Sequence, residues 1–520
     1  MTEKNVALVS YAVQSKGPVP SGLMLEGGAH LAGRLLQNGY VPTVYDFNNV
    51  NSIKKISQEG KEEFLDDTIN QLHEKIQKDD IRLIGFTLYT NGFKDNIKIA
   101  QELKKRNPGL MIAAGGPLVG WFEEEIFTYT DTFDILVRGE GDQAIVALAD
   151  MVYNNASLSA VPGAIYQTNI GINKNKKIVT DISSLPFPIY DQEVYPDLDS
   201  KIKVSTLRTT VGCRWGRCNF CPQPKIDGRY RERDIENVLA EIEHLKSNHG
   251  IRKFRLADPN PSPEQLRKLF DGLPDDVKIS CFAYSDQNYD FDNSAKNLLG
   301  LFIGIESMDP VVLSSLNKTD HPKEYIGQCK EMLAEAKRHG IATVYANIVP
   351  TANDTTERIR KDLENVIELQ PDFITALPLA PIPGTPLYRK ILKDGEKTGV
   401  RLNPKFLKEL MLYELDLLNP SSWRNPPFQL KVDGKFIENP FTTRNELFSD
   451  PLAKQNIQMA SDEIVLMAHL YHEGLDQDQD RRRVQVNEFQ NRLRADVSEG
   501  DHQDLEKMVD QMNQSNTDSR

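Results

Sequence analysis

Short apolar stretches alternate with helical stretches through the first 155 residues, and this alternation constrains the fold more than any other feature. The predicted strands cover residues 6–10, 41–45, 82–87, 110–114 and 133–137, and helices are predicted over residues 21–38 and 93–106. Strands that alternate with helices pair in parallel, so the pattern predicts a doubly wound, Rossmann-like α/β sheet. Ligands of such sheets bind beyond the carboxyl ends of the strands.

Three of these predicted strand ends carry loops that suit a ligand. The loop residues are Tyr89, Thr90, Asn91, then Gly115, Gly116, Pro117, and then Arg138, Gly139, Glu140, Gly141. Tight turns also need glycine for purely structural reasons, so a structural role stays open. No G-x-G-x-x-G fingerprint follows the first strand, which speaks against a nicotinamide or flavin domain.

Three cysteines in one short turn carry the clearest chemical signal. Four residues separate Cys213 from Cys218, and two separate Cys218 from Cys221. Thiolates at this spacing can bind three irons of one [4Fe-4S] cube and leave the fourth iron open for a substrate or cofactor. Structural zinc would need a fourth ligand, and the nearest downstream histidines, His244 and His249, lie on or at the end of a predicted helix. Zinc and unliganded core cysteines remain the alternatives.

We expect the remaining two cysteines to have a structural role. Cys281 lies in a predicted buried strand and Cys329 in a predicted helix, where a free thiol behaves as a small apolar side chain. An odd count of five cysteines and no recognisable signal peptide argue against a disulfide-stabilised secreted protein. No apolar run approaches the length of a membrane span. We therefore expect a cytoplasmic protein.

Strand and helix patterns resume in the second part of the chain. Strands are predicted at residues 203–208, 252–257, 278–284, 301–306, 342–348 and 373–377, with a helix over residues 233–246. Six such βα units predict a partial barrel. The expected organisation is an N-terminal domain (1–155), a packed linker (156–200), the barrel (201–390), a mainly helical C-terminal region bordering the substrate cavity (391–475) and a polar tail (476–520). Within the C-terminal region, helices are predicted over residues 407–418 and 461–472.

The net charge excludes one class of partner. The 520 residues carry a formal charge of −13, and their basic stretches are interrupted by acids. Binding of nucleic acid requires clustered Lys and Arg to neutralise phosphates, so we expect no nucleic-acid partner.

The ordered motifs of residues 5–390 resemble those of the cobalamin-dependent radical S-adenosylmethionine enzymes. The resemblance is carried by Pro20-Ser-Gly22, Gly39, Tyr45-Asp46, Gly85-Phe-Thr, Gly115-Gly116-Pro117, Arg138-Gly139-Glu140-Gly141, the three-cysteine turn, Tyr230, Gly304-Ile305-Glu306-Ser307, Leu316-Asn-Lys318 and Pro381-Ile-Pro383-Gly384.

The resemblance implies a role for each candidate residue. Cys213, Cys218 and Cys221 would bind a [4Fe-4S] cluster, and Phe220 would pack beside the adenine of S-adenosylmethionine. Glu306 and Ser307 would contact the amino-acid part or ribose of that cofactor. The loops at residues 89–91, 115–117 and 138–141 would bind cobalamin. The family usually has three residues between the first two cysteines, whereas this chain has four.

The implied reaction is methylation of an unactivated carbon of a small biosynthetic substrate, through a 5′-deoxyadenosyl radical and methylcobalamin. An external one-electron reductant of the flavodoxin or ferredoxin type would supply electrons. Two alternatives stay open: a non-methylating enzyme of the same family that catalyses cyclisation, ring contraction or rearrangement, and a cluster-bearing binding protein without catalysis.

Overall fold

The computed structural model describes residues 3–11, 23–24, 26–89, 92–196, 202–284, 290–371, 373–407, 410 and 426–440. The described residues fall into two compact units, one that runs to Ser205 and one that begins at Thr206. Thr90, Asn91, the helix predicted over residues 461–472 and the polar segment 476–520 lie outside the described residues.

The first unit is built on a seven-stranded sheet of order β3-β1-β4-β5-β6-β7-β8. Its strands are β1 (Asn5–Ser10), β3 (Val41–Asp46), β4 (Leu83–Thr87), β5 (Met111–Gly115), β6 (Ile135–Val137), β7 (Ala164–Thr168) and β8 (Gly171–Lys174). The first five pair in parallel, as predicted. The strand order reverses beside β1, where Ser10 aligns with Asp46 and Thr87, so a ligand-binding edge is expected there.

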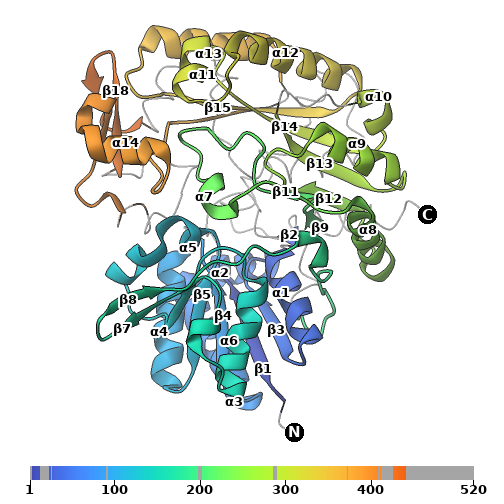
Figure 1. Ribbon diagram of the computed structural model, residues 1–520, viewed down its shortest axis with the longest axis vertical. Coiled ribbons are helices and arrows are strands. Elements are labelled where there is room, and N and C mark those ends of the chain that lie inside the picture. The colour runs from blue at the N-terminus through green and yellow to red at the C-terminus, as the bar shows by residue number, and fades with distance from the viewer. Residues whose placement is uncertain are drawn as a thin grey trace. The chain divides into compact units, whose positions relative to one another are not determined.

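Helices cover both faces of this sheet (Figure 1). They are α1 (Glu26–Gln37), α2 (Val50–Glu59), α3 (Lys61–Lys78), α4 (Phe93–Arg106), α5 (Pro117–Phe122) and α6 (Asp142–Asn154). Helix α1 packs against α6, and α3 packs against α2 and α4. Helix α4 shows why these segments are helical: Phe93, Ile97, Ala100 and Leu103 are buried at helical spacing. The result is the doubly wound arrangement predicted above.

Two local predictions for this unit were wrong or incomplete. The helix expected from Ser21 begins at Glu26, because Leu23–Met24 form the short strand β2, which pairs with Ile202 and Ser205 of the same unit. The stretch 156–200 contains the β7–β8 hairpin, which extends the sheet in antiparallel fashion. All four residues of β8 are exposed or half-exposed, so the hairpin has no apolar alternation to reveal it.

In the second unit the strands follow the order β16-β15-β14-β13-β12, and β9, which begins in the first unit and ends in the second, comes next. Their bounds are β9 (Ile202–Leu207), β12 (Lys253–Leu256), β13 (Lys278–Ala283), β14 (Leu298–Glu306), β15 (Ala342–Ile348) and β16 (Phe373–Leu377). Strands β12 to β16 pair in parallel. These six strands match the six predicted ones, and those at residues 342–348 and 373–377 match at both ends. The prediction of a partial α/β barrel is thereby confirmed.

The helices of this unit are α7 (Gln223–Asp227), α8 (Ile235–His249), α9 (Pro263–Gly272), α10 (Phe291–Ser294), α11 (Pro310–Ser315), α12 (Pro322–Arg338), α13 (Thr356–Glu368) and α14 (Pro386–Asp394). In Figure 1, α8, α9, α12 and α13 follow the outer side of the strands. A short ribbon of β10 (Thr210–Val211) and β11 (Arg231–Glu232) flanks the segment that carries the cysteines.

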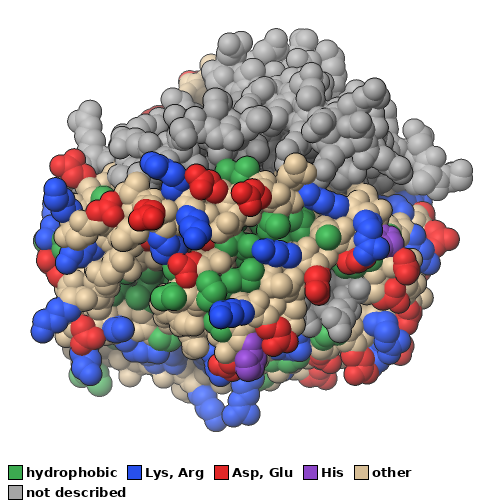
Figure 2. All heavy atoms as spheres, turned by 90° about the horizontal axis from the view of Figure 1, so that it is seen from above, with side chains coloured by type: hydrophobic (Ala, Val, Ile, Leu, Met, Phe, Trp, Pro, Cys, Tyr) green, Lys and Arg blue, Asp and Glu red, His purple; other side chains and the backbone are tan. Residues whose placement is uncertain are grey.

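The described part of the C-terminal region also includes a small antiparallel sheet, which the sequence did not predict. It contains β17 (Val400–Leu402), β18 (Phe428–Val432) and β19 (Lys435–Phe436). Most of the helix predicted over residues 407–418 lies outside the described residues. On the face drawn in Figure 2, acidic and basic side chains are interspersed over the described surface. None of the helices in the described ranges is long and apolar enough to cross a membrane.

Candidate cluster and cofactor site

The three-cysteine loop lies between β10 and α7 and begins with a turn at Gly212 that requires glycine. This glycine has φ +83°, and a Cβ on it would lie 2.9 Å from the carbonyl oxygen of Arg229. A side chain is therefore excluded by both conformation and space. Cys213 follows directly and makes a β-bridge with Asn260, just beyond β12. The start of the loop is thus fixed to the carboxyl end of a barrel strand.

The three thiols influence one another electrostatically. Burial, together with negative charge on Glu306, Cys221 and Cys213, raises the pKa of Cys218 to about 12, although Lys318 opposes the shift. Burial likewise raises the pKa of Cys221 to about 11. In the metal-free chain Cys218 and Cys221 are therefore protonated, and metal binding as thiolates would release their protons.

The donor set fits an iron–sulfur cluster. Soft thiolates are the ligands that such clusters use. Within the described ranges, no three His, Cys, Asp or Glu side chains form a group that could hold a metal ion. A cube binds each thiolate through a different iron, so its ligands need not converge on one point. Cys281 and Cys329 are buried in β13 and α12, as expected for apolar packing.

Glu306 ends β14 in a strained conformation and is paired with a lysine. Its φ is +63°, and its carboxylate accepts a 2.8 Å hydrogen bond from the Lys318 amino group. Both side chains are buried, and a Cβ on Gly304 would lie 3.0 Å from the Glu306 carboxylate and 3.2 Å from the Lys318 amino group. Glycine at position 304 thus makes room for the ion pair.

Sequence reasoning assigned no role to Lys318. Its amino group lies 4.7 Å from the centre of the Tyr284 ring, so the cation also contacts an aromatic face. Burial lowers the pKa of this amine, but Glu306 and Cys218 more than compensate and raise it overall. Lys318 is therefore a buried cation whose charge acts on the cysteine loop.

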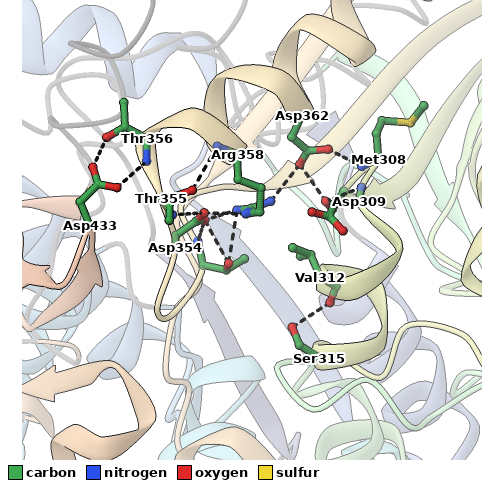
Figure 3. Close-up of polar contacts among 12 residues, drawn as sticks. Met308, Asp309, Val312, Ser315, Asp354, Thr355, Thr356, Arg358, Asp362 and Asp433 are labelled. Carbon is green, nitrogen blue, oxygen red and sulfur yellow. Dashed lines mark hydrogen bonds and ion pairs between the residues drawn. The ribbon is translucent and has the colours of Figure 1, made fainter.

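Ser307 faces away from this ion pair toward α13. Its hydroxyl donates a 2.8 Å hydrogen bond to Asp362 and accepts one from the Asp309 amide at 3.0 Å. The Met308 amide also donates to Asp362 (Figure 3). Arg358 bridges Asp362 and Asp354 in the same network. The fully buried Ser307 side chain thus anchors the turn that follows Glu306.

Phe220 is half-buried in the cysteine loop, directly before Cys221. Its neighbour Asn219 is held at both ends of its backbone. The Asn219 amide donates to the Leu316 carbonyl at 3.0 Å, and the Asn219 carbonyl accepts from the Leu387 amide at 2.9 Å. The aromatic ring is therefore carried on a fixed backbone.

In the first unit, the loop after β5 is governed by packing. Gly116 has φ +91°, and a Cβ there would lie 3.0 Å from both the Leu88 carbonyl oxygen and the Thr87 methyl group. The chain itself therefore fills the space beside Gly116. A Cβ on Gly115 would meet only the Val137 carbonyl at 3.6 Å, and Pro117 begins α5. Tyr89 is half-buried beyond β4.

The loop after β6 is tied to residues 175–180. Arg138 contacts Glu123 and the Asn175 carbonyl, each at 3.2 Å, and the Glu140 carboxylate accepts from the Thr180 amide at 2.7 Å. Gly139 has φ +86° and lies against the Lys177 side chain, while Gly141 precedes α6. Both charged side chains of this loop are therefore engaged within the unit.

Two family models match the chain, one on each side of the boundary between the two units. The family model of the B12 binding domain matches residues 49–149, and that of the radical SAM superfamily matches residues 207–366. The second match includes the cysteine loop, Glu306, Ser307 and Lys318. The two matches imply three cofactors: cobalamin, an iron–sulfur cluster and S-adenosylmethionine.

Several known proteins resemble the chain over most of its length. An uncharacterized methyltransferase from Pyrococcus horikoshii is 24% identical over 340 residues, 63% of this chain and 73% of the relative. The anaerobic magnesium-protoporphyrin IX monomethyl ester cyclase of Rubrivivax gelatinosus is 24% identical over 396 residues, 72% of this chain and 66% of the relative. The structure of the radical S-adenosylmethionine methyltransferase TsrM from Kitasatospora setae, with cobalamin and a [4Fe-4S] cluster bound, superposes with a TM-score of 0.66 at 16% identity. It covers 94% of this chain and 99% of TsrM, and this likeness concerns the fold.

Proposed function

We propose that this chain, which belongs to the radical S-adenosylmethionine superfamily and carries a B12-binding domain, methylates an unactivated carbon of a small biosynthetic substrate. The observation that carries the proposal is the loop of three free cysteines, Cys213, Cys218 and Cys221, within the matched radical SAM region. The methyl-transfer step is supported by the relatives that are named methyltransferases.

In this proposal Cys213, Cys218 and Cys221 bind the cluster as thiolates. When bound, the cluster and S-adenosylmethionine supply a carbon-centred radical, and cobalamin supplies the methyl group. The buried Lys318 partly offsets the negative charge of the thiolates, and Glu306 keeps Lys318 in place through their 2.8 Å ion pair. Phe220 would offer an apolar face to the adenine.

For Ser307 we propose a structural role in place of the cofactor contact that the resemblance implied. Its hydroxyl is engaged by Asp362 and Asp309, so we assign it to holding the Glu306 turn. Contact with the amino-acid part or ribose of S-adenosylmethionine is left to Glu306 and to backbone groups of the turn.

For cobalamin, we propose that residues 1–155 form the binding domain and residues 201–390 the catalytic barrel, joined by residues 156–200. The side chains of Arg138 and Glu140 are held by contacts within the unit. Cobalamin contacts are therefore assigned to Tyr89, to Thr90 and Asn91, and to the backbone of Gly115, Gly116, Pro117, Gly139 and Gly141. The region 391–475 is proposed to border the substrate cavity.

The proposal also requires a one-electron donor. We expect an external flavodoxin or ferredoxin type of protein in a reducing cytoplasm, because thiolates that bind a cluster with an open iron are sensitive to oxidation.

The similarity to the cyclase supports a second candidate, a non-methylating reaction of the same cofactors. The product ratio during turnover separates the two. A methylating enzyme releases S-adenosylhomocysteine and 5′-deoxyadenosine in about equal amounts, since one S-adenosylmethionine serves each half-reaction. Sustained substrate turnover with 5′-deoxyadenosine but no S-adenosylhomocysteine would reject methyl transfer and favour the second candidate.

A further inference from the structure

We propose that residues 315–320, the clasp, position the four-residue spacer between Cys213 and Cys218, and that Asn317 is the main positioning residue. The inference rests on the proposed function, because it concerns the loop assigned to the cluster. It gives a physical role to the spacer of residues 214–217, whose length was unusual in the sequence.

The spacer and the clasp are joined by reciprocal hydrogen bonds. The Trp215 indole nitrogen donates to the Asn317 carbonyl oxygen at 2.8 Å, and the Asn317 side-chain amide donates to the Arg217 carbonyl oxygen at 2.7 Å. One residue of the clasp thus holds both sides of the spacer's turn. The turn itself is made by Gly216, which has φ +57°.

Further contacts extend the attachment on either side of Asn317. The Asn219 side-chain amide donates to the Ser315 carbonyl at 2.6 Å, and the Asn219 backbone amide donates to the Leu316 carbonyl at 3.0 Å. The Arg217 guanidinium forms a 2.5 Å ion pair with Asp320 and lies 3.6 Å from the centre of the Trp215 ring. The clasp therefore contacts the spacer and the residue after Cys218.

The clasp has its own rigid attachment to the barrel. Asn317 adopts φ +53°, a conformation that asparagine tolerates better than most residues. The next residue, Lys318, is fixed by its ion pair with Glu306 and by a hydrogen bond from the Tyr284 hydroxyl to its carbonyl. The barrel strand β14 is thus connected through residues 306, 318 and 317 to the loop of the cysteines.

A loop of six residues without this attachment would sample many conformations, and its two end cysteines would rarely be placed together for one cluster. The clasp removes that freedom before iron binds. Its contribution is to preorganise Cys213 and Cys218, while Asn317 itself touches no ligand thiol in any contact described above.

The test uses the full chain with two single variants and a matched control. Asn317→Gly keeps the left-handed conformation accessible and removes the hydrogen bond to Arg217. Trp215→Phe keeps an aromatic ring and removes the hydrogen bond to Asn317. Asn155→Gly is the control, because Asn155 also adopts a left-handed conformation (φ +56°) but ends α6 in the first unit.

Two readouts are measured for each protein: iodoacetamide alkylation rates of the individual cysteines in the iron-free chain, by peptide mass spectrometry, and the rate of chelator-driven iron loss after anaerobic reconstitution. In both Asn317→Gly and Trp215→Phe we expect Cys213 and Cys218 to react, and iron to leave, about fivefold faster, the factor that one typical hydrogen bond contributes. Cys281 and Cys329 should keep their rates.

Rates at Cys213 and Cys218 that match those of the control would overturn the inference, as would equal acceleration at all five cysteines, which indicates general unfolding. A wild-type chain that takes up no iron would contradict the proposed function instead. In that case the alkylation rates of the iron-free chain still decide whether the clasp orders the loop.

Discussion

Lys318 and Glu306 form a buried ion pair, with 2.8 Å between the amino nitrogen and a carboxylate oxygen, beside the loop that carries Cys218. The pair connects the end of β14 to the turn between α11 and α12. It also brings one buried cation near the thiols, which no motif spacing in the sequence had indicated.

Replacing Lys318 by an uncharged residue should lower the stability of the second unit strongly. Lys318→Met leaves the Glu306 carboxylate buried and uncompensated, and loss of one partner of a buried pair costs about 3–5 kcal/mol. The urea-unfolding midpoint of the iron-free chain reports this loss. Lys268→Met is the control, because Lys268 forms a 2.8 Å pair with Glu264 on the exposed surface of α9. Equal effects of the two variants would contradict this account of the buried pair.

Asp258 should make stability depend on acid pH. Burial raises the pKa of this carboxyl to about 6, although hydrogen bonds from Thr209 and Thr210 oppose the shift. Because the folded-state pKa lies above the unfolded value, the contribution is fully present below about pH 4 and is lost as pH rises through about 6.

We therefore expect Asp258→Asn to flatten the pH dependence of the unfolding free energy between about pH 4 and 6, by up to about 3 kcal/mol. Urea unfolding of the iron-free chain at several pH values checks this. An unchanged slope in the variant would show that Asp258 keeps an ordinary pKa.

Gly116 should be required for the stability of the first unit even when no cobalamin is present. Gly116→Val places a β-branched side chain at φ +91° and against the Leu88 carbonyl oxygen, and strain of this kind costs about 1–3 kcal/mol. A lowered thermal unfolding midpoint without any cobalamin present is the expected result. Gly109→Ala is the control, since a Cβ at Gly109 meets nothing within 4 Å. A stable variant with weakened cobalamin binding would instead indicate that Gly116 faces the ligand.

The parallel sheets could be predicted because their strands are buried on both faces and therefore appear as continuous apolar runs. Strand β15, for example, was located at both ends from its run of small and apolar residues. The β7–β8 hairpin was missed because β8 lies at an exposed edge, where no packing constrains its residues. Local periodicity reports burial, so elements with little burial leave little signal.

The expected cluster ligands could be proposed from the sequence, but the residues that hold the ligand loop in place could not. The spacing of Cys213, Cys218 and Cys221 is a local property of the chain. Contacts such as Trp215 with Asn317 join residues about 100 positions apart, and only the fold brings them together. The same holds for Ser307, whose partner Asp362 comes from α13 and redirects the hydroxyl that the resemblance had assigned to the cofactor.

Iron content after anaerobic reconstitution tests the central claim most directly. We expect about four irons per wild-type chain. Cys213→Ala, Cys218→Ala and Cys221→Ala should each lose most of this iron, whereas Cys281→Ala and Cys329→Ala, which alter buried apolar positions, should keep it. If Cys281→Ala loses as much iron as Cys218→Ala, or if the wild-type chain binds a single zinc ion in place of iron, the assignment of the three-cysteine loop to a radical SAM cluster is contradicted.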